Sequence, residues 1–152
     1  LLAENRLNQG RASDAERLRR QAQSLREQER DIGTFAQRLM LRSGQIIEAR
    51  QTLEKMVLDE EEKPVSRPRA HRETTLLLSI IYALLGERDH AYRMALAGTE
   101  RGHTLNSPFI TAVGWMRQGH SWLLLKNRHG YDQAKKAFQE AINISDQLRA
   151  DR

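Results

Sequence analysis

The chain has 152 residues and a formal net charge of +5 at pH 7, with 30% charged and only 5% aromatic residues. Its length suits a single domain, in which roughly 70% of the unfolded surface becomes buried. The absence of cysteine excludes disulfides, thiolate metal ligands and a cysteine nucleophile. Leu, Ala, Arg, Glu and Gln fill long stretches of the sequence, and this composition predicts an all-α protein.

The ends and the charge pattern bear on the location and partners of the protein. No apolar run approaches the length of a membrane span, and the opening LLAENRLNQG lacks the order of a signal peptide. We therefore expect a cytoplasmic protein with no membrane contact. Because the sequence begins without a methionine or a helix cap, we expect residues 1–152 to be one domain of a longer chain. Arginines are scattered among glutamates, which is typical of solvated helix faces and makes direct nucleic-acid binding an unfavoured interpretation.

Helical periodicity recurs along the chain and predicts pairs of helices. The expected helices cover about 1–9, 12–27, 31–43, 45–58, 70–85, 88–102, 108–127 and 131–148. Glycines that lie 34, 42 and 44 residues apart mark the turns, namely Gly10, Gly44, Gly86 and Gly130. Four or five residues after each glycine comes an alanine, which lets two helices approach closely: Ala15, Ala49, Ala91 and Ala134. The sequence therefore predicts four helical hairpins.

The stretch DEEEKPVSRPRAH interrupts the helical pattern between the second and third hairpins. Pro64 and Pro68 lack an amide donor and push the residues before them towards extended geometry. We therefore predict a charged, proline-containing loop over residues 59–69. We interpret it as a solvated spacer, and a hinge or a partner-docking loop is the alternative.

The last hairpin begins at Ser107 and Pro108, which fit an N-cap and the first helical position. Gly114 and Gly119 follow within the same predicted helix. Each destabilises a helix by about 1 kcal/mol relative to alanine. Such glycines indicate close contact with a neighbouring helix.

Both tryptophans of the chain, Trp115 and Trp122, also belong to this helix and lie two turns apart on one face. We interpret them as packing residues between adjacent hairpins. A stacking platform for a ligand is the alternative interpretation.

The third and fourth units carry a recognisable set of small and aromatic positions. In the third unit these are Ser79, Tyr82, Gly86 and Ala91. In the fourth they are Trp115, Gly119, Trp122, Ala134, Phe138 and Ala141. The pattern resembles the tetratricopeptide repeat, a two-helix motif. This resemblance implies a right-handed superhelix of about four antiparallel helical hairpins.

A narrower resemblance concerns LNSPFITAVGWMRQGHSWLL together with the AFQEAINISDQLRADR that follows. It is similar to the helical-repeat region of MalT-like, ATPase-linked bacterial transcriptional activators. The resemblance implies a sensor or protein-interaction region in a chain that also carries ATPase and DNA-binding domains. The sequence has no G-x-x-x-x-G-K-[ST] phosphate loop, so the ATPase of such a relative would lie outside it.

In the register that the repeat resemblance implies, polar and basic residues of the first helices face a concave groove. The groove positions include Asn8, Asp31, Arg38, Arg42, Glu73, Met116 and His120. Such a lining suits a protein or peptide segment or a small effector, because arginines make directional bonds to carboxylates or phosphates. Ordinary solvated surface is the alternative interpretation.

The histidines and acidic residues show no spacing that predicts chemistry. No H-x-x-x-H or H-E-x-x-H pair is present, and no hydrolase or kinase motif occurs. We therefore predict no metal, no cofactor and no enzymatic activity.

The first functional hypothesis is an effector- or partner-binding region of a bacterial transcriptional regulator. The alternative is a ligand-free scaffold or a module that forms a homo-oligomer.

Overall fold

The computed structural model of the chain describes residues 6, 9–25, 34–62 and 68–150. These residues form seven helices and no strand, which confirms the all-α prediction. The helices are α2 (Ala12–Leu25), α3 (Phe35–Arg42), α4 (Ile46–Glu62), α5 (Pro68–Leu84), α6 (Arg88–Thr104), α7 (Pro108–Leu123) and α8 (Arg128–Ala150). Within this described part, no helix has both the length and the apolar character that crossing a membrane requires.

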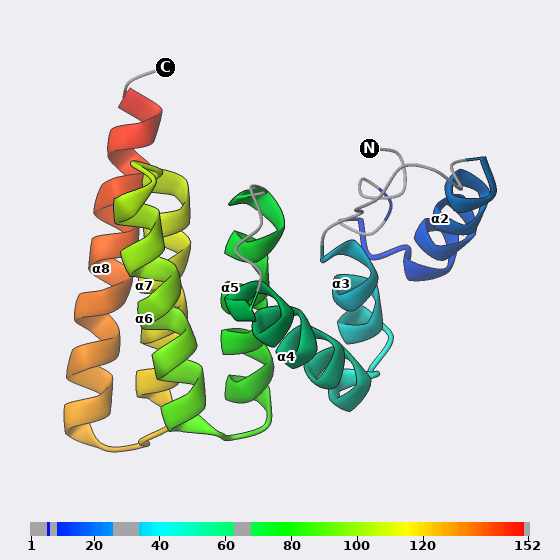
Figure 1. Cartoon of the computed structure of the whole chain (residues 1–152). Coiled ribbons are helices and arrows are strands. Elements are labelled where there is room, and N and C mark those ends of the chain that lie inside the picture. The colour runs from blue at the N-terminus through cyan, green and yellow to red at the C-terminus, as the bar shows by residue number, and fades with distance from the viewer. Residues whose placement is uncertain (1–5, 7–8, 26–33, 63–67, 151–152) are drawn as a thin grey trace.

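Each helix packs against the next one along the chain, and the packing is densest from α5 to α8. Figure 1 shows α5, α6, α7 and α8 standing side by side, while α4 runs obliquely to α5. Helix α7 contacts α5 in addition to its chain neighbours α6 and α8. Helices α2 and α3 lie on the other side of α4 and touch each other only lightly.

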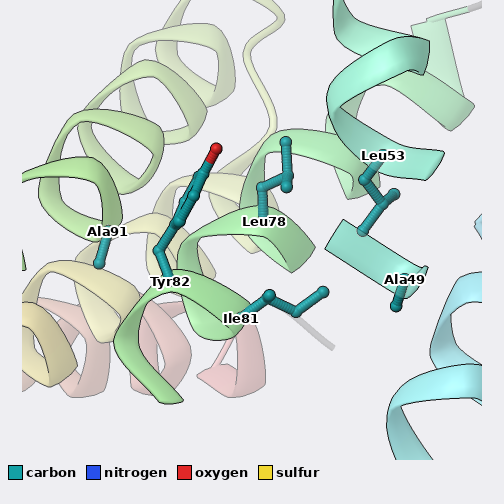
Figure 2. Close-up of a cluster of buried hydrophobic side chains, with 6 residues drawn as sticks. All are labelled: Ala49, Leu53, Leu78, Ile81, Tyr82 and Ala91. Atoms are coloured by element: carbon teal, nitrogen blue, oxygen red, sulfur yellow. The ribbon is translucent and has the colours of Figure 1, made fainter. Parts of the chain in front are cut away.

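A buried apolar cluster joins α4 to α5 and α6. Figure 2 shows Ala49 and Leu53 of α4 facing Leu78 and Ile81 of α5, with Tyr82 directed between the helices. Leu53 and Ile81 are completely buried, and burial of such a side chain contributes about 1.5–3 kcal/mol. This cluster fixes α4 on the α5–α8 block.

A polar network covers the edge of this cluster. The Tyr82 hydroxyl donates a 2.6 Å hydrogen bond to Glu54 Oε1. Arg50 bridges the same carboxylate and Glu87, with N–O distances of 3.1 and 2.8 Å. Three helix segments, the middle of α4, the end of α5 and the start of α6, are therefore tied together.

Glycines in the left-handed region make three of the predicted turns. Gly10, Gly44 and Gly86 have φ values of +76°, +79° and +79°. No neighbouring atom would obstruct a Cβ at these positions, so backbone conformation rather than space requires glycine. The prediction of turn glycines is confirmed at all three.

The prediction that Gly130 makes the fourth turn is wrong. Gly130 lies inside α8 and is buried, and a Cβ there would lie 2.7 Å from the Trp122 carbonyl oxygen. The positive φ of this turn, +50°, belongs to Lys126. Asn127 begins α8 by accepting a 2.8 Å hydrogen bond from the Gly130 amide through Oδ1. This side-chain cap starts α8 at Arg128, three residues before the predicted start.

The helix boundaries on either side of the predicted 59–69 loop also differ from the structure, and α7 ends at Leu123, before the predicted residue 127. Helix α4 continues to Glu62 and α5 begins at Pro68, so the ends of the predicted 59–69 loop are helical. Its middle, residues 63–67, lies outside the described residues. Pro68 is compatible with the start of α5, because the first turn of a helix needs no amide donor from it.

Ser107 occupies the N-cap position of α7, but its side chain makes no cap hydrogen bond.

The predicted close contacts at Gly114 and Gly119 are confirmed. A Cβ on Gly114 would lie 2.8 Å from the backbone N and Cα of Thr99 in α6. A Cβ on Gly119 would lie 2.5 to 2.7 Å from the Phe138 ring of α8. Helix α7 therefore sits between α6 and α8 with no room for a methyl group at either contact.

Candidate binding surface on helix α7

Opposite sides of α7 have different environments. Gly114, Gln118 and Ser121 are buried, and the Gln118 amide donates a 2.8 Å hydrogen bond to Thr99 Oγ1 in α6. Met116 and His120, one turn apart on another side of the helix, remain part-exposed. The contacts with α6 therefore fix the helix while leaving these two side chains accessible.

Arg117 lies beside His120 and is the main charged group of this surface. Its Nη1 is 3.4 Å from His120 Nδ1, a long contact. Its Nε is buried and has no hydrogen-bond partner among the described residues, a property that it shares with the Nε atoms of Arg50 and Arg88. Within the described part of the chain, no carboxylate lies at ion-pair distance from Arg117. Burial lowers the pKa of Arg117, because the charged form is poorly solvated there.

His120 shares this environment and contacts the last helix. Its pKa is lowered, first by burial and second by the charge of Arg117. Its ring lies against Phe138 of α8, with centroids 5.5 Å apart and planes at 64°. Phe138 is held there by Gly119, whose missing side chain leaves space for the ring. We call Met116, Arg117, His120 and Phe138 the α7 patch.

Two other part-buried arginines each have a carboxylate at ion-pair distance. Arg50 has Glu54 and Glu87 as partners. Arg88 pairs with Asp89 at 2.6 Å and lies over the Trp122 ring, 4.3 Å from its centroid. Arg117 is similarly placed in part-buried surroundings, but its nearest polar contact is a histidine.

Trp122 packs between hairpins, as we predicted. Tyr92 of α6 and His129 of α8 meet its ring edge-on, at centroid distances of 5.2 and 5.7 Å. With Arg88 on its face, the ring is enclosed on several sides by the protein itself. The packing interpretation is therefore confirmed for Trp122, and Trp115 is part-buried on the same helix.

The predicted groove residues do not all meet at one place. Met116 and His120 belong to the α7 patch. Arg38 and Arg42 lie on α3, where Arg38 is part-buried over the Phe35 ring at 5.8 Å and Arg42 is exposed. Helix α3 packs mainly on α4. These two arginines are therefore not neighbours of the α7 patch.

The remaining predicted groove residues lie outside what the structure describes. Asn8 and Asp31 are outside the described residues altogether. Glu73 belongs to α5, but its side chain is outside the described part. Their contribution to a groove stays a prediction.

Comparisons with protein-family models, with curated proteins and with solved structures find no match for this chain. Across the described residues, no three His, Asp or Glu side chains are grouped so as to hold a metal ion. The chemistry of the α7 patch is therefore judged from its own geometry.

Sequence reasoning missed Arg117 and Phe138 as members of this surface. A signal for Arg117 is present, because the residues three and four positions away are Val113, Gly114, His120 and Ser121. None of these is acidic, whereas Arg20 has Glu16 and Arg50 has Glu54 one turn away. Phe138 gives no such signal, because its place beside His120 depends on the packing of α8.

Proposed function

We propose that this chain is a tetratricopeptide-like domain, a right-handed superhelix of about four antiparallel hairpins that binds a partner segment or a small effector. Support for the repeat interpretation comes from the third unit. There the Ser79 hydroxyl donates a 2.8 Å hydrogen bond to the Ala91 carbonyl oxygen, and Gly86 supplies the positive φ of the turn between them. Two positions of the repeat pattern thus meet directly.

The observation that carries the binding role is the α7 patch. It combines a part-exposed guanidinium, which has no carboxylate partner among the described residues, with an imidazole and two apolar side chains. The patch stands on the most densely packed of the described helices, so the backbones that carry its side chains are held in place before a ligand arrives. Charged groups with this kind of perturbed environment are concentrated at functional sites.

We place the domain in a bacterial transcriptional regulator, as its sensor or protein-interaction region, on the basis of the resemblance described for residues 105–152. Stacked hairpins offer an extended surface suited to binding. In this proposal the ligand favours one arrangement of the repeats, and that shift in population changes how flanking ATPase and DNA-binding domains act.

The test uses the full-length gene product and a reporter for the promoter that it controls. Alanine variants at Arg38, Arg42 and His120 are compared with the unmodified protein at matched expression. We expect the response to the effector or partner to fall in these variants. If all three variants respond as the unmodified protein does, the groove takes no part in the mechanism. If the full-length gene product has no DNA-binding segment, the regulatory role is wrong.

A ligand-free scaffold or a dimerisation module is the second candidate, favoured by exposed apolar residues on the last helices. Phe109, Tyr131 and Ile142 are 69, 54 and 51% exposed. Tyr131 and Ile142 are three turns apart and share one face of α8. Light scattering over a concentration range tests self-association. If dimers form and Ile142→Lys dissociates them, this second function is supported.

A further inference from the structure

We propose that Arg117 and His120 form a carboxylate site that takes a glutamate or aspartate side chain of an acidic partner peptide. Met116 and Phe138 would contact the apolar residues beside that acid. The inference rests on the proposed binding function of the α7 patch and names the chemical class of its partner.

Arg117 has hydrogen-bonding capacity that the described residues leave unfilled. A guanidinium has five N–H donors in a planar fork that matches the two oxygens of a carboxylate. Among the described residues, this fork contacts His120, at 3.4 Å between Nη1 and Nδ1. An incoming carboxylate would supply both a negative charge and short, charge-assisted bonds.

His120 lies beside Arg117 and adds a second polar group to the site. One ring nitrogen faces Arg117 at 3.4 Å, and the ring packs against Phe138 rather than against an acid. Within the described residues, neither group is paired with a carboxylate. A carboxylate placed against the pair can accept hydrogen bonds from the guanidinium and from the His120 ring nitrogen that does not face Arg117, whereas the Arg117 charge would repel a cationic ligand.

Apolar side chains border the site and favour a peptide as the partner. Met116, one turn from His120 on α7, and Phe138, whose ring lies against His120, are both part-exposed, so a ligand gains from an apolar group next to its acid. A peptide that alternates Glu and Leu has this chemistry. Inorganic phosphate or an oligonucleotide offers the charge alone, without the apolar contact.

The binding experiment uses the whole 152-residue chain and a synthetic, end-capped octapeptide of alternating Glu and Leu. Binding is measured by calorimetry, and the contact is located by NMR shifts of the Arg117 side-chain N–H and the His120 ring. The comparison ligands are the same peptide with Gln for Glu, glutarate, inorganic phosphate and a short oligonucleotide. We expect the Glu peptide to bind at least about tenfold more tightly than the Gln peptide, and more tightly than glutarate.

The chain offers a matched control for the substitutions. Arg93 and His90 are also three residues apart with a 3.4 Å contact, but both are exposed on α6. Arg117→Gln should weaken binding of the Glu peptide about tenfold or more, and His120→Gln about threefold. Arg117→Lys, which keeps the charge and loses the fork, should fall between Arg117→Gln and the unmodified chain. Arg93→Gln, with the same change in net charge, should alter binding less than twofold.

Several results would overturn the carboxylate site. They are an equal effect of Arg117→Gln and Arg93→Gln, equal binding of the Glu and Gln peptides, and a preference for the oligonucleotide over the peptide. Circular dichroism and thermal unfolding show that each variant is folded, so that a loss of binding reports on the site.

Failure of this inference and failure of the proposed function give different results. If the peptide does not bind but the promoter response still depends on Arg38 or Arg42, the carboxylate site is wrong and the groove function stands. If the peptide binds through Arg117 but Arg117→Gln leaves the promoter response unchanged, the site stands and its regulatory use is wrong.

Discussion

The hydroxyl of Ser79 donates a 2.8 Å hydrogen bond to the carbonyl oxygen of Ala91, which joins α5 to α6 inside the protein. Ser79 is 1% exposed and Ala91 is fully buried. The bond crosses between the two helices of one hairpin at the point where both side chains are small. Ser79 therefore contributes a short side chain and a directed polar contact at the same position.

Substitution of Ser79 by alanine should lower the free energy of unfolding by about 1 kcal/mol, the usual net contribution of one hydrogen bond. Urea denaturation followed by circular dichroism measures this change. Thr104→Ala is the control, because the Thr104 hydroxyl bonds to its own helix in an exposed position and its loss should change stability by less than about 0.5 kcal/mol. Equal effects of the two substitutions would contradict the assigned role of Ser79.

Gly114→Ala should be more destabilising than Gly119→Ala. The new methyl group at position 114 would meet the backbone of Thr99, whereas at position 119 it would meet the Phe138 ring. A ring can rotate away more easily than a helix backbone can move. We expect a loss of about 1–3 kcal/mol for Gly114→Ala, in the range of overpacked cores. Thermal unfolding of both variants gives the order, and the reverse order would show that α6 yields more easily than Phe138.

Lys126→Gly should stabilise the protein by about 1 kcal/mol, because a non-glycine residue at positive φ is strained. Lys136→Gly is the matched control, since it removes the same charge from an exposed position within α8. That change should destabilise the helix by about 1 kcal/mol. The two substitutions should change the free energy of unfolding in opposite directions, and this comparison tests the assignment of the turn to residue 126. A destabilising effect of Lys126→Gly would refute that assignment.

Tyr82 should make stability fall at alkaline pH. Its pKa is raised to about 12, first by burial, then by the hydrogen bond to Glu54 and the charge of that carboxylate. An unfolded tyrosine ionises near pH 10. The stabilising contribution is therefore complete below pH 10 and is lost as the pH rises from 10 to 12. At 1.36 kcal/mol per pKa unit, about 2–3 kcal/mol is the upper limit of this loss, and solvent screening at the part-buried hydroxyl lowers it.

Urea unfolding of the unmodified chain and of Tyr82→Phe at pH 8 and pH 11 measures this contribution. The phenylalanine variant should lose less stability between the two pH values, because it has no hydroxyl to ionise. Tyr131→Phe, at an exposed position on α8, should follow the unmodified chain. Parallel losses in all three proteins would show that Tyr82 is not the group responsible.

Arg117→Met should raise the free energy of unfolding by about 1 kcal/mol while it weakens peptide binding. The substitution removes a part-buried charge without a carboxylate partner and keeps an apolar side chain of similar length. Arg50→Met should have the opposite effect and lower stability by about 1 kcal/mol, since it leaves Glu54 and Glu87 without their cation. If Arg117→Met destabilises the chain, Arg117 is a structural residue.

Much of the helical pattern was predictable from local sequence. Apolar periodicity predicted the helices from α2 to α8. Gly44 and Gly86 indicated turns because the tolerance of a positive φ depends on the residue type at that one position. The turn before α8 was misplaced for the same local reason. Lys126 adopts a conformation that its residue type disfavours, and Asn127 caps the helix with a side chain whose partner is three residues away.

The candidate site was predictable only in part. The register of the repeat pattern placed Met116 and His120 on an accessible side of α7, where the structure also has them part-exposed. For Arg117, the sequence shows only that no acidic residue lies one helical turn away. Its burial, and its distance from the carboxylates of other described helices, depend on how the helices pack. Phe138 reaches His120 because α8 closes on Gly119, a contact between residues 18 positions apart that no local pattern specifies.

The uneven packing along the chain has a consequence for its slow motions. Helices α6 and α7 are enclosed by neighbours, whereas α2 and α3 touch few others. Amide protons of α2 and α3 should therefore exchange with deuterium through local opening, at rates far above those of α6 and α7. The N-terminal helices would open and close repeatedly while the amides beneath the α7 patch stay protected.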